Sequence, residues 1–293
     1  MFPWKYPVCS RFMNPAMNLS GIKLVVTDMD GTLLNNMGEI SPKFFPLLEE
    51  MRNHDIRFAV ASGRQYYTLR NMFDQVKEDL VFIADNGAIT MKDDERIHIQ
   101  AIDPQRVLKL VKALKGIGEK HIIVCGVKTA YVEQTGPLFL ETLRTHFSRF
   151  EVVRDLTDLP EDEILNVTVC NFSGAEEHTM PQVEFLKDEF QVKLSGDIWV
   201  DFTHEHAHKG NALHEVQRKF QITPDETMVF GDYLNDLELF DNAAFSFAMA
   251  NAHEQVKQKA RFLAESNEEE GVVKIIEKML RAKNRERQVA ICP

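Results

Sequence analysis

The sequence has few cysteines and lacks a long apolar run. Its four cysteines lie far apart and form no C-x-x-C pair, so neither a disulfide framework nor a structural zinc site is expected. Such sparse cysteine use is typical of a reducing compartment, and we expect a cytoplasmic protein. A membrane-spanning helix needs about 18 or more consecutive apolar residues. No such stretch occurs, so we expect no membrane partner.

Positive charge is also in short supply. The 34 lysines and arginines are outnumbered by 45 aspartates and glutamates, which leaves a formal net charge of −11. A surface of this charge repels the phosphate backbone of a nucleic acid, so we expect no nucleic-acid partner. It also repels small anions at long range. A site for an anionic ligand would therefore need local lysine or arginine side chains, helix N-termini or a metal ion.

Low-complexity and secretory segments are missing as well. With 14 glycines, 11 prolines and 44% apolar residues, the chain has an ordinary globular composition and should bury a core. Its first twenty residues contain three prolines and no long apolar run, unlike a secretory signal. We expect residues 1–20 to form a loose leader, with Met13 and Met17 as alternative start positions, because the first clear strand pattern begins at Ile22.

Apolar runs and helical patterns alternate in the first part of the chain. The run Ile22–Thr27 is typical of a strand that is buried on both faces of a parallel sheet. The β/α/β/α/β alternation predicts a doubly wound, Rossmann-like α/β sheet. The expected elements are a strand at Ile22–Thr27, a helix after Ser41 and Pro42, a strand at 57–61, a helix at 65–76 and a strand at 80–84.

The pattern changes after residue 88 and returns near residue 203. The intervening segment predicts helices at 104–115, 137–147 and 178–190, and strands at 122–125 and 165–172. The βα alternation then resumes from Lys209 and ends in a helix that begins at Gly271. We therefore expect a core domain at 21–88 and 203–293, interrupted by an inserted α+β cap at 89–202.

The first candidate site is the segment Asp28-Met29-Asp30-Gly31-Thr32, directly after the first predicted strand. Ligands gather at the carboxyl ends of strands in open α/β sheets. Two carboxylates at positions i and i+2 can share one site, where one attacks as a nucleophile or binds a metal and the other exchanges protons. Taken alone, the segment is equally compatible with an Asp-Gly turn that ends a strand.

Three further segments lie at strand ends or helix starts. Each has an ordinary explanation by itself: a serine N-cap, a solvated lysine, and a polar turn. Their coincidence in one predicted domain is hard to assign to chance. They are Ser62-Gly63-Arg64, Lys209-Gly210-Asn211, and the run from Gly231 through Asp232 to Asn235 and Asp236.

In type and in order, these four motifs resemble the haloacid dehalogenase (HAD) superfamily of aspartate-nucleophile phosphotransferases. The resemblance covers nearly all of residues 20–285. The insertion between the second and third motifs, with DNGA at 85–88 and HKGNAL at 208–213, resembles the Cof-type, subclass IIB branch with an α/β cap. The resemblance implies a Mg²⁺-dependent phosphatase of sugar phosphates and other small phosphorylated metabolites.

The family pattern also implies a role for each motif residue. Asp28 would be the nucleophile that becomes an aspartyl phosphate, and Asp30 would be the general acid and then the general base. Ser62, the Gly63 backbone, Lys209 and Asn235 would bind phosphate or substrate. Mg²⁺ would lie between the Asp28 carboxylate, the Asp30 main-chain carbonyl and Asp232, with Asp236 supporting these ligands.

Other interpretations stay open at this point. A phosphosugar mutase would use the same motifs, and a non-catalytic phosphometabolite sensor would use fewer of them. A signalling receiver is about half this length and lacks a cap. The alternating His204, His206 and His208 favour a polar loop over a zinc site. We expect the acidic run 268–270 and the basic segment 281–287 to be solvated surface.

Overall fold

The computed structural model describes residues 19–118 and 120–291. Most of the predicted leader, two of the cysteines, and both alternative start positions lie outside the described residues. The chain divides into two compact units, at 1–61, 79–81 and 217–293, and at 62–78 and 82–216. This division groups 62–78, 82–88 and 203–216 with the predicted insertion. The domain boundaries at 88/89 and 202/203 stay a prediction.

The first unit contains five parallel strands in the order β14-β13-β12-β1-β2. Every side chain of β1 is buried, as expected for a strand covered on both faces. In the register, Thr27 at the end of β1 lies beside Phe230 of β12. The strands are β1 (Leu24–Thr27), β2 (Arg57–Ala61), β12 (Thr227–Gly231), β13 (Phe245–Ala248) and β14 (Phe262–Leu263).

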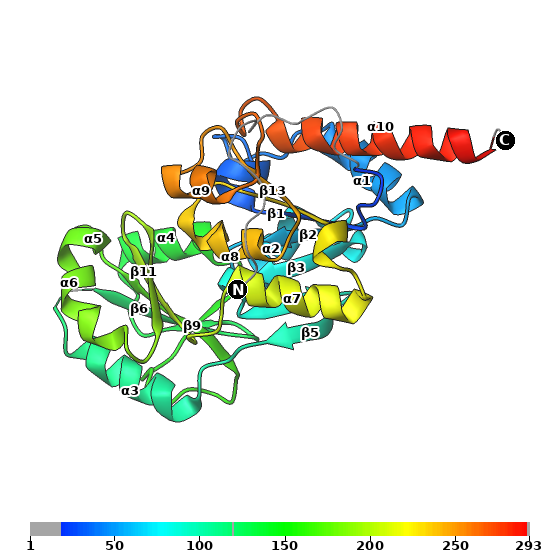
Figure 1. The fold of residues 1–293 in the computed structure, drawn as a ribbon. Coiled ribbons are helices and arrows are strands. Elements are labelled where there is room, and N and C mark those ends of the chain that lie inside the picture. Colours follow the sequence, from blue (N-terminus) through cyan, green and yellow to red (C-terminus); the bar gives the residue numbers. More distant parts are fainter. Residues whose placement is uncertain (1–18, 119, 292–293) are drawn as a thin grey trace. The chain divides into compact units, whose positions relative to one another are not determined.

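Helices α1 (Phe44–Asn53) and α10 (Gly271–Ile291) of this unit lie side by side (Figure 1). The predicted first helix starts later than the Ser41-Pro42 signal suggested, because the backbone N–H of Phe44 first closes a turn onto the carbonyl of Ser41. The other helices are α8 (Leu237–Asp241) and α9 (Glu254–Lys259), with single turns η5 (Pro224–Glu226) and η6 (Leu234–Asp236).

The second unit contains two further sets of strands. Residues 82–84 of β3 (Leu80–Ala84) pair antiparallel with β4 (Ile89–Lys92), which pairs antiparallel with β5 (Glu95–Ile99). A six-stranded sheet has the order β10-β11-β9-β6-β7-β8, and only β7 and β8 pair parallel. Its strands are β6 (His121–Gly126), β7 (Ala130–Val132), β8 (Phe150–Val152), β9 (Ile164–Cys170), β10 (Gln191–Gly196) and β11 (Trp199–Thr203).

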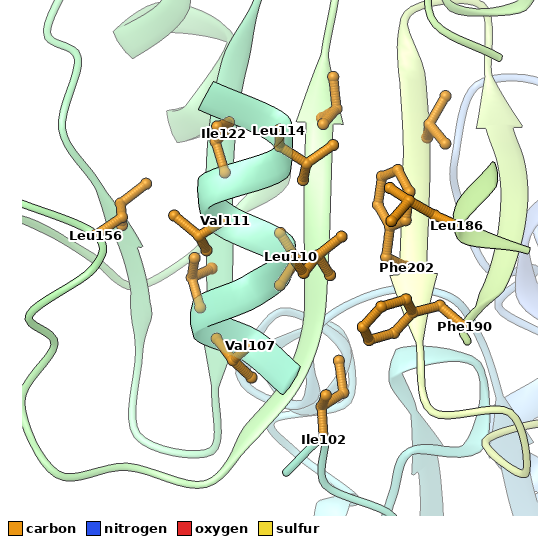
Figure 2. Packing of buried hydrophobic residues seen from close by; sticks show 14 of the residues in the cluster. Ile102, Val107, Leu110, Val111, Leu114, Ile122, Leu156, Leu186, Phe190 and Phe202 are labelled. Atoms are coloured by element: carbon orange, nitrogen blue, oxygen red, sulfur yellow. The ribbon is translucent and has the colours of Figure 1, made fainter. Parts of the chain in front are cut away.

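Helix α3 (Pro104–Lys115) covers one face of the six-stranded sheet. Its Val107, Leu110, Val111 and Leu114 point into the cluster that Figure 2 shows, together with Phe202 of the sheet. Because side chains alternate along a strand, the residues between those of the cluster lie on the opposite face. The remaining helices are α2 (Tyr66–Met72), α4 (Pro137–His146), α5 (Ala175–His178), α6 (Met180–Val183) and α7 (Lys209–Phe220), with single turns η2 (Lys77–Asp79) and η4 (Glu184–Leu186).

The prediction of one helix at 178–190 is wrong. This segment is broken into the end of α5, the short helix α6 and the turn η4. Pro181 explains the break, since proline has no N–H to donate and disfavours helical geometry in the residue before it. Across the described residues, no helix combines the length and apolarity that a membrane crossing requires.

Candidate active site

Three carboxylates gather at one edge of the parallel sheet in the first unit. Asp28 directly follows β1 and Asp232 directly follows β12, its parallel neighbour. Carboxyl ends of parallel strands share one edge, so these side chains meet although the chain separates them widely. One oxygen each of Asp28, Asp232 and Asp236 lies within 4.8 Å of the others. Asp28 and Asp236 are buried, and Asp232 is partly buried.

Hydrogen bonds hold two of these carboxylates in place. The Asp236 Oδ2 accepts from the backbone N–H groups of Asp232, at 3.0 Å, and Tyr233, at 3.2 Å. The Thr32 hydroxyl donates to Asp232 Oδ1 at 2.9 Å. These contacts fix the orientations of both carboxylates, as the hydrogen bonds that support metal ligands commonly do.

Glycine is required where the Asp28 segment turns. After Asp28 the chain forms one wide turn, η1 (Met29–Leu33), in which Gly31 has a φ of +77°. A Cβ at this position would lie 2.3 Å from Asp232 Oδ2. Any side chain here would therefore both strain the backbone and displace the Asp232 carboxylate.

Asp30 and Asn235 occupy other places. The Asp30 side chain is exposed, and its carboxylate is not part of the cluster formed by Asp28, Asp232 and Asp236. Asp30 itself is a residue of the turn η1, and its side chain is accessible to solvent. Asn235 lies in η6 and is partly exposed. Their predicted roles stay predictions.

The second unit brings together the other motif residues. The backbone N–H of Ser62 donates to the carbonyl of Ile83, and the Ser62 carbonyl accepts from the Asn86 N–H at 3.0 Å. A Cβ on Gly63 would lie 3.1 Å from the side-chain amide nitrogen of Asn86, so the segments that contain Gly63 and Asn86 approach closely. The buried Ser62 Oγ accepts from the Arg64 N–H at 3.1 Å. Ser62 and Gly63 are thus fixed by the turn η3 (Asp85–Gly87).

Lys209 is fully buried at the first position of α7. A cation is unfavourable at the positive end of a helix dipole and costly to bury unless a negative group lies next to it. The turn η3 also packs against this helix start, since a Cβ on Gly87 would lie 2.5 Å from the carbonyl oxygen of His208. The position therefore suits an anion-binding lysine better than a solvated one.

Two of the three histidines before α7 accept hydrogen bonds from backbone N–H groups of the same segment. His204 Nδ1 accepts from the N–H of His206 at 3.1 Å, and His208 Nδ1 accepts from the N–H of Asn211 at 3.2 Å. In the part of the chain that the structure describes, Asp28, Asp232 and Asp236 are the one group with metal-ligand spacing. The histidines do not form such a group.

Asp85 is a candidate residue to which sequence reasoning assigned no role, although it stands in the DNGA motif. Its backbone has a φ of +48°, its side chain is 3% exposed, and its Oδ2 has no hydrogen-bond partner among the described residues. Burial and the nearby Asp201 raise the pKa of Asp85 from 3.8 to about 8. A hydrogen bond from the Tyr66 N–H lowers this pKa, but by less than burial raises it. The signal was the Asp-Asn-Gly sequence directly after a strand.

Asp85→Asn is expected to increase stability at alkaline pH. In the unfolded chain this aspartate ionises near pH 4, whereas the folded protein retains the proton until about pH 8. Stability is therefore lost as the pH rises between these values, by at most about 1.4 kcal/mol for each pH unit. Asparagine keeps the acceptor for Tyr66 and cannot ionise, so the variant should melt higher than wild type at pH 8 and equally at pH 4.

Thermal melts from pH 4 to pH 9 check this expectation. The exposed Asp188→Asn serves as the matched control and should follow the wild-type curve at every pH. A constant difference in melting temperature between Asp85→Asn and wild type across this range would contradict the assigned titration.

Comparisons with known proteins agree with the motifs. A family model described as haloacid dehalogenase-like hydrolase matches residues 25–276. The chain is also 32% identical over 267 residues to 5-amino-6-(5-phospho-D-ribitylamino)uracil phosphatase YbjI of Escherichia coli K12, with 89% of this chain and 97% of that protein covered. The chain belongs to the haloacid dehalogenase-like hydrolases. It is an enzyme, a phosphoric monoester hydrolase, as its curated relatives are.

Solved structures share the fold of this chain. The crystal structure of SMU.1108c from Streptococcus mutans UA159 is 29% identical, with a TM-score of 0.80 and coverage of 89% of this chain and 99% of that one. A HAD subclass IIB sugar phosphatase, BT4131, is 22% identical with a TM-score of 0.71, over 87% and 98% of the two chains. The predicted family and the α/β fold class with a parallel-sheet core are confirmed.

Proposed function

We propose that this HAD enzyme is a Mg²⁺-dependent phosphatase of small phosphorylated metabolites, most specifically of sugar phosphates, and that it acts through an aspartyl phosphate on Asp28. The observation that carries the proposal is the group formed by Asp28, Asp232 and Asp236 at the end of the parallel strands. A nucleophilic carboxylate beside two further carboxylates is the arrangement that cation-assisted phosphoryl transfer needs.

The donor set fits Mg²⁺. Three carboxylates with oxygens within 4.8 Å repel one another, and two of them are buried, so a bound cation would relieve the repulsion. Mg²⁺ prefers oxygen ligands. Asp28 and Asp232 would hold it together with the Asp30 carbonyl, and Asp236 would orient Asp232 through the N–H that it accepts from. The bound ion supplies neutralisation of the charge on the phosphoryl oxygens.

The protein's own residues then carry out two half-reactions. In the first, an Asp28 oxygen attacks phosphorus, the bond from phosphorus to the ester oxygen breaks, and Asp30 gives its proton to the leaving alkoxide. In the second, Asp30 takes a proton from water and the oxygen of that water attacks phosphorus. The bond from phosphorus to the Asp28 oxygen breaks, which releases inorganic phosphate and restores the Asp28 carboxylate. We propose that Ser62, the Gly63 N–H, Lys209 and Asn235 bind the phosphoryl oxygens or substrate during both steps.

A sugar phosphate is supported by the polar face of the six-stranded sheet. One cross-strand row joins Lys193, Asp201 and Thr168, and Asn166 lies two rows further along, where it pairs with Thr203. The Thr168 hydroxyl donates to Asp201 Oδ1 at 2.7 Å, and the Asn166 amide donates to Thr168 Oγ1 at 3.0 Å. Alternating donors and acceptors suit hydroxyl groups. The named substrate of the relative YbjI likewise carries a phosphorylated ribityl chain, which is a polyol.

A phosphate-release screen tests this function, with sugar and alditol phosphates and p-nitrophenyl phosphate, each with and without Mg²⁺. We expect release without a bisphosphate activator, which a mutase would require. Asp201→Asn should lower kcat/KM for the polyol phosphates about 10-fold, since one acceptor oxygen for a substrate hydroxyl becomes an NH₂ donor, and leave p-nitrophenyl phosphate unchanged. The exposed Asp197→Asn, in the same hairpin, should match wild type.

Two results would contradict parts of the proposal. Equal losses on both substrate classes would make Asp201 a structural residue and remove the support for a polyol. No phosphate release from any ester in the panel would contradict the proposed activity on sugar and alditol phosphates. We also propose a cytoplasmic location, supported by Cys125 and Cys170, the described cysteines, which are free buried thiols.

A further inference from the structure

Two asparagines bind the chain that follows the nucleophile segment. The Asn251 side-chain amide donates to the carbonyl of Gly31 at 2.7 Å. The Asn267 side-chain amide donates to the carbonyl of Leu34 at 3.0 Å and to Asn36 Oδ1 at 3.2 Å. Asn251 follows β13 and Asn267 precedes α10, so two distant loops hold both ends of the segment 31–36.

The two asparagines are also bonded to each other. The backbone N–H of Asn267 donates to Asn251 Oδ1 at 3.1 Å. Because this bond takes up the amide oxygen, the Asn251 amide nitrogen is directed to Gly31. Asn267 is 7% exposed, so water competes little for its contacts. We call Asn251 and Asn267 the asparagine clamp.

The acidic run beside the clamp extends it: Glu268 and Glu269 are exposed, as expected for a solvated run, whereas Glu270 is only partly exposed. Glu268 Oε1 accepts from the N–H of Asn36 at 2.5 Å. Glu270 Oε1 accepts from the Ser41 hydroxyl at 2.6 Å, and its other oxygen pairs with Lys43. The loop before α10 therefore contacts the chain at residues 34, 36, 41 and 43.

The clamp acts on the turn that carries the proposed chemistry. A hydrogen bond to the Gly31 carbonyl fixes the peptide between Gly31 and Thr32. Thr32 in turn holds Asp232 Oδ1, and Asp30, the proposed acid and base, stands directly before Gly31. The left-handed Gly31 has no side chain of its own that could restrain this turn. Asn251 therefore supplies a restraint that the motif itself lacks.

We propose that Asn251, oriented by Asn267, is a positioning residue that fixes the turn Asp30–Thr32 and so prepares the Asp232 carboxylate and the Asp30 carbonyl for the cation. This inference rests on the proposed function for its effect on catalysis. Its effect on the metal-free protein does not depend on that function. Residues that orient metal ligands in this indirect way typically contribute about 10- to 100-fold to metal affinity or activity.

Asn251→Ala removes the donor to Gly31, and the exposed Asn251 should tolerate the change. In the metal-free variant, amide hydrogen exchange should become faster in peptides covering residues 29–36 and stay unchanged in β12 and β13. The dissociation constant for Mg²⁺, measured by calorimetry without substrate, should rise about 10-fold, and kcat should fall with little change in KM. Asn284→Ala is the matched control, because Asn284 is exposed and also makes two side-chain hydrogen bonds.

Each outcome decides between the two proposals. Unchanged exchange in 29–36 together with unchanged Mg²⁺ affinity would overturn the clamp, even if the enzyme is an active phosphatase. Faster exchange and weaker Mg²⁺ binding would support the clamp even if no phosphate ester in the panel is hydrolysed. Should the alanine variant not fold, Asn251→Asp keeps the acceptor for Asn267, loses the donor and adds a negative charge, so the decision then rests on its exchange pattern and not on its Mg²⁺ affinity.

Discussion

Phosphate release by the Asp28→Asn variant is expected to fall to the uncatalysed rate. A neutral amide is a poor nucleophile, so the covalent step is lost, and one of the three clustered carboxylates is lost with it. The backbone N–H of Asp28 donates to the carbonyl of Phe230, and this bond does not involve the side chain. The variant should therefore fold like wild type and be inactive with good and poor leaving groups alike.

Two aspartate variants provide the comparison. Asp30→Asn keeps the nucleophile and loses the proton exchange that general acid and base catalysis makes worth roughly 10²- to 10⁴-fold. It should therefore retain measurable activity with a good leaving group, which needs little protonation. Asp188→Asn, at an exposed position in the other unit, should behave as wild type. Rapid multiple turnover by Asp28→Asn would contradict the assignment of the nucleophile.

Removing Mg²⁺ with a chelator is expected to abolish activity, and Ca²⁺ is not expected to restore it. Ca²⁺ takes about 6–8 ligands at longer distances than Mg²⁺ and can bind a carboxylate through both oxygens. Asp28 bound in that way would no longer have an oxygen directed at phosphorus. Assays in chelator, followed by titration with each cation, measure the effect. Full activity in chelator would contradict the proposed cation site.

A binding measurement separates this prediction from turnover. A ligand that binds only the folded protein stabilises it, by about 2.7 kcal/mol when the ligand concentration is 100 times the dissociation constant. This stabilisation raises the melting temperature. Mg²⁺ should raise the melting temperature of wild type, and Asp232→Asn should lose most of this increase. An equal increase in both proteins would show that Mg²⁺ binds somewhere other than the carboxylate group.

Much of the fold could be predicted because local signals agree with the tertiary structure. Helix α3 begins at Pro104 as expected, since Asp103 caps it by accepting from the next N–H groups. The hairpin of β4 and β5 was missed. Its turn contains Asp93 and Asp94, both with positive φ, where Asn-Gly or Asp-Gly would be the recognisable signal. Strand β10 was also missed, although Val192 and Leu194 alternate with polar residues along it, which is the pattern of a half-buried strand.

Some contacts of the candidate site could also be predicted from the sequence, and others could not. Asp28 and Asp232 could be placed together because parallel strands bring their ends to one edge. The contact of Thr32 with Asp232 spans 200 positions, and the bond from Asn251 to Gly31 spans 220. Such contacts depend on loop paths, for which the sequence has no periodic signal. Asp236, predicted as a supporting residue, also belongs to the carboxylate group itself.

The central claim, that Asp28 is the nucleophile, is tested most directly by trapping the intermediate. The Asp30→Asn protein is mixed with Mg²⁺ and a phosphate ester with a good leaving group, quenched in acid within the first turnover, and digested for mass spectrometry. Loss of the general base should slow hydrolysis of the intermediate, so we expect one added phosphoryl group on Asp28 and none in an Asp28→Asn, Asp30→Asn double variant. A phosphoryl group on any other residue, or an equal amount in the double variant, would contradict the account.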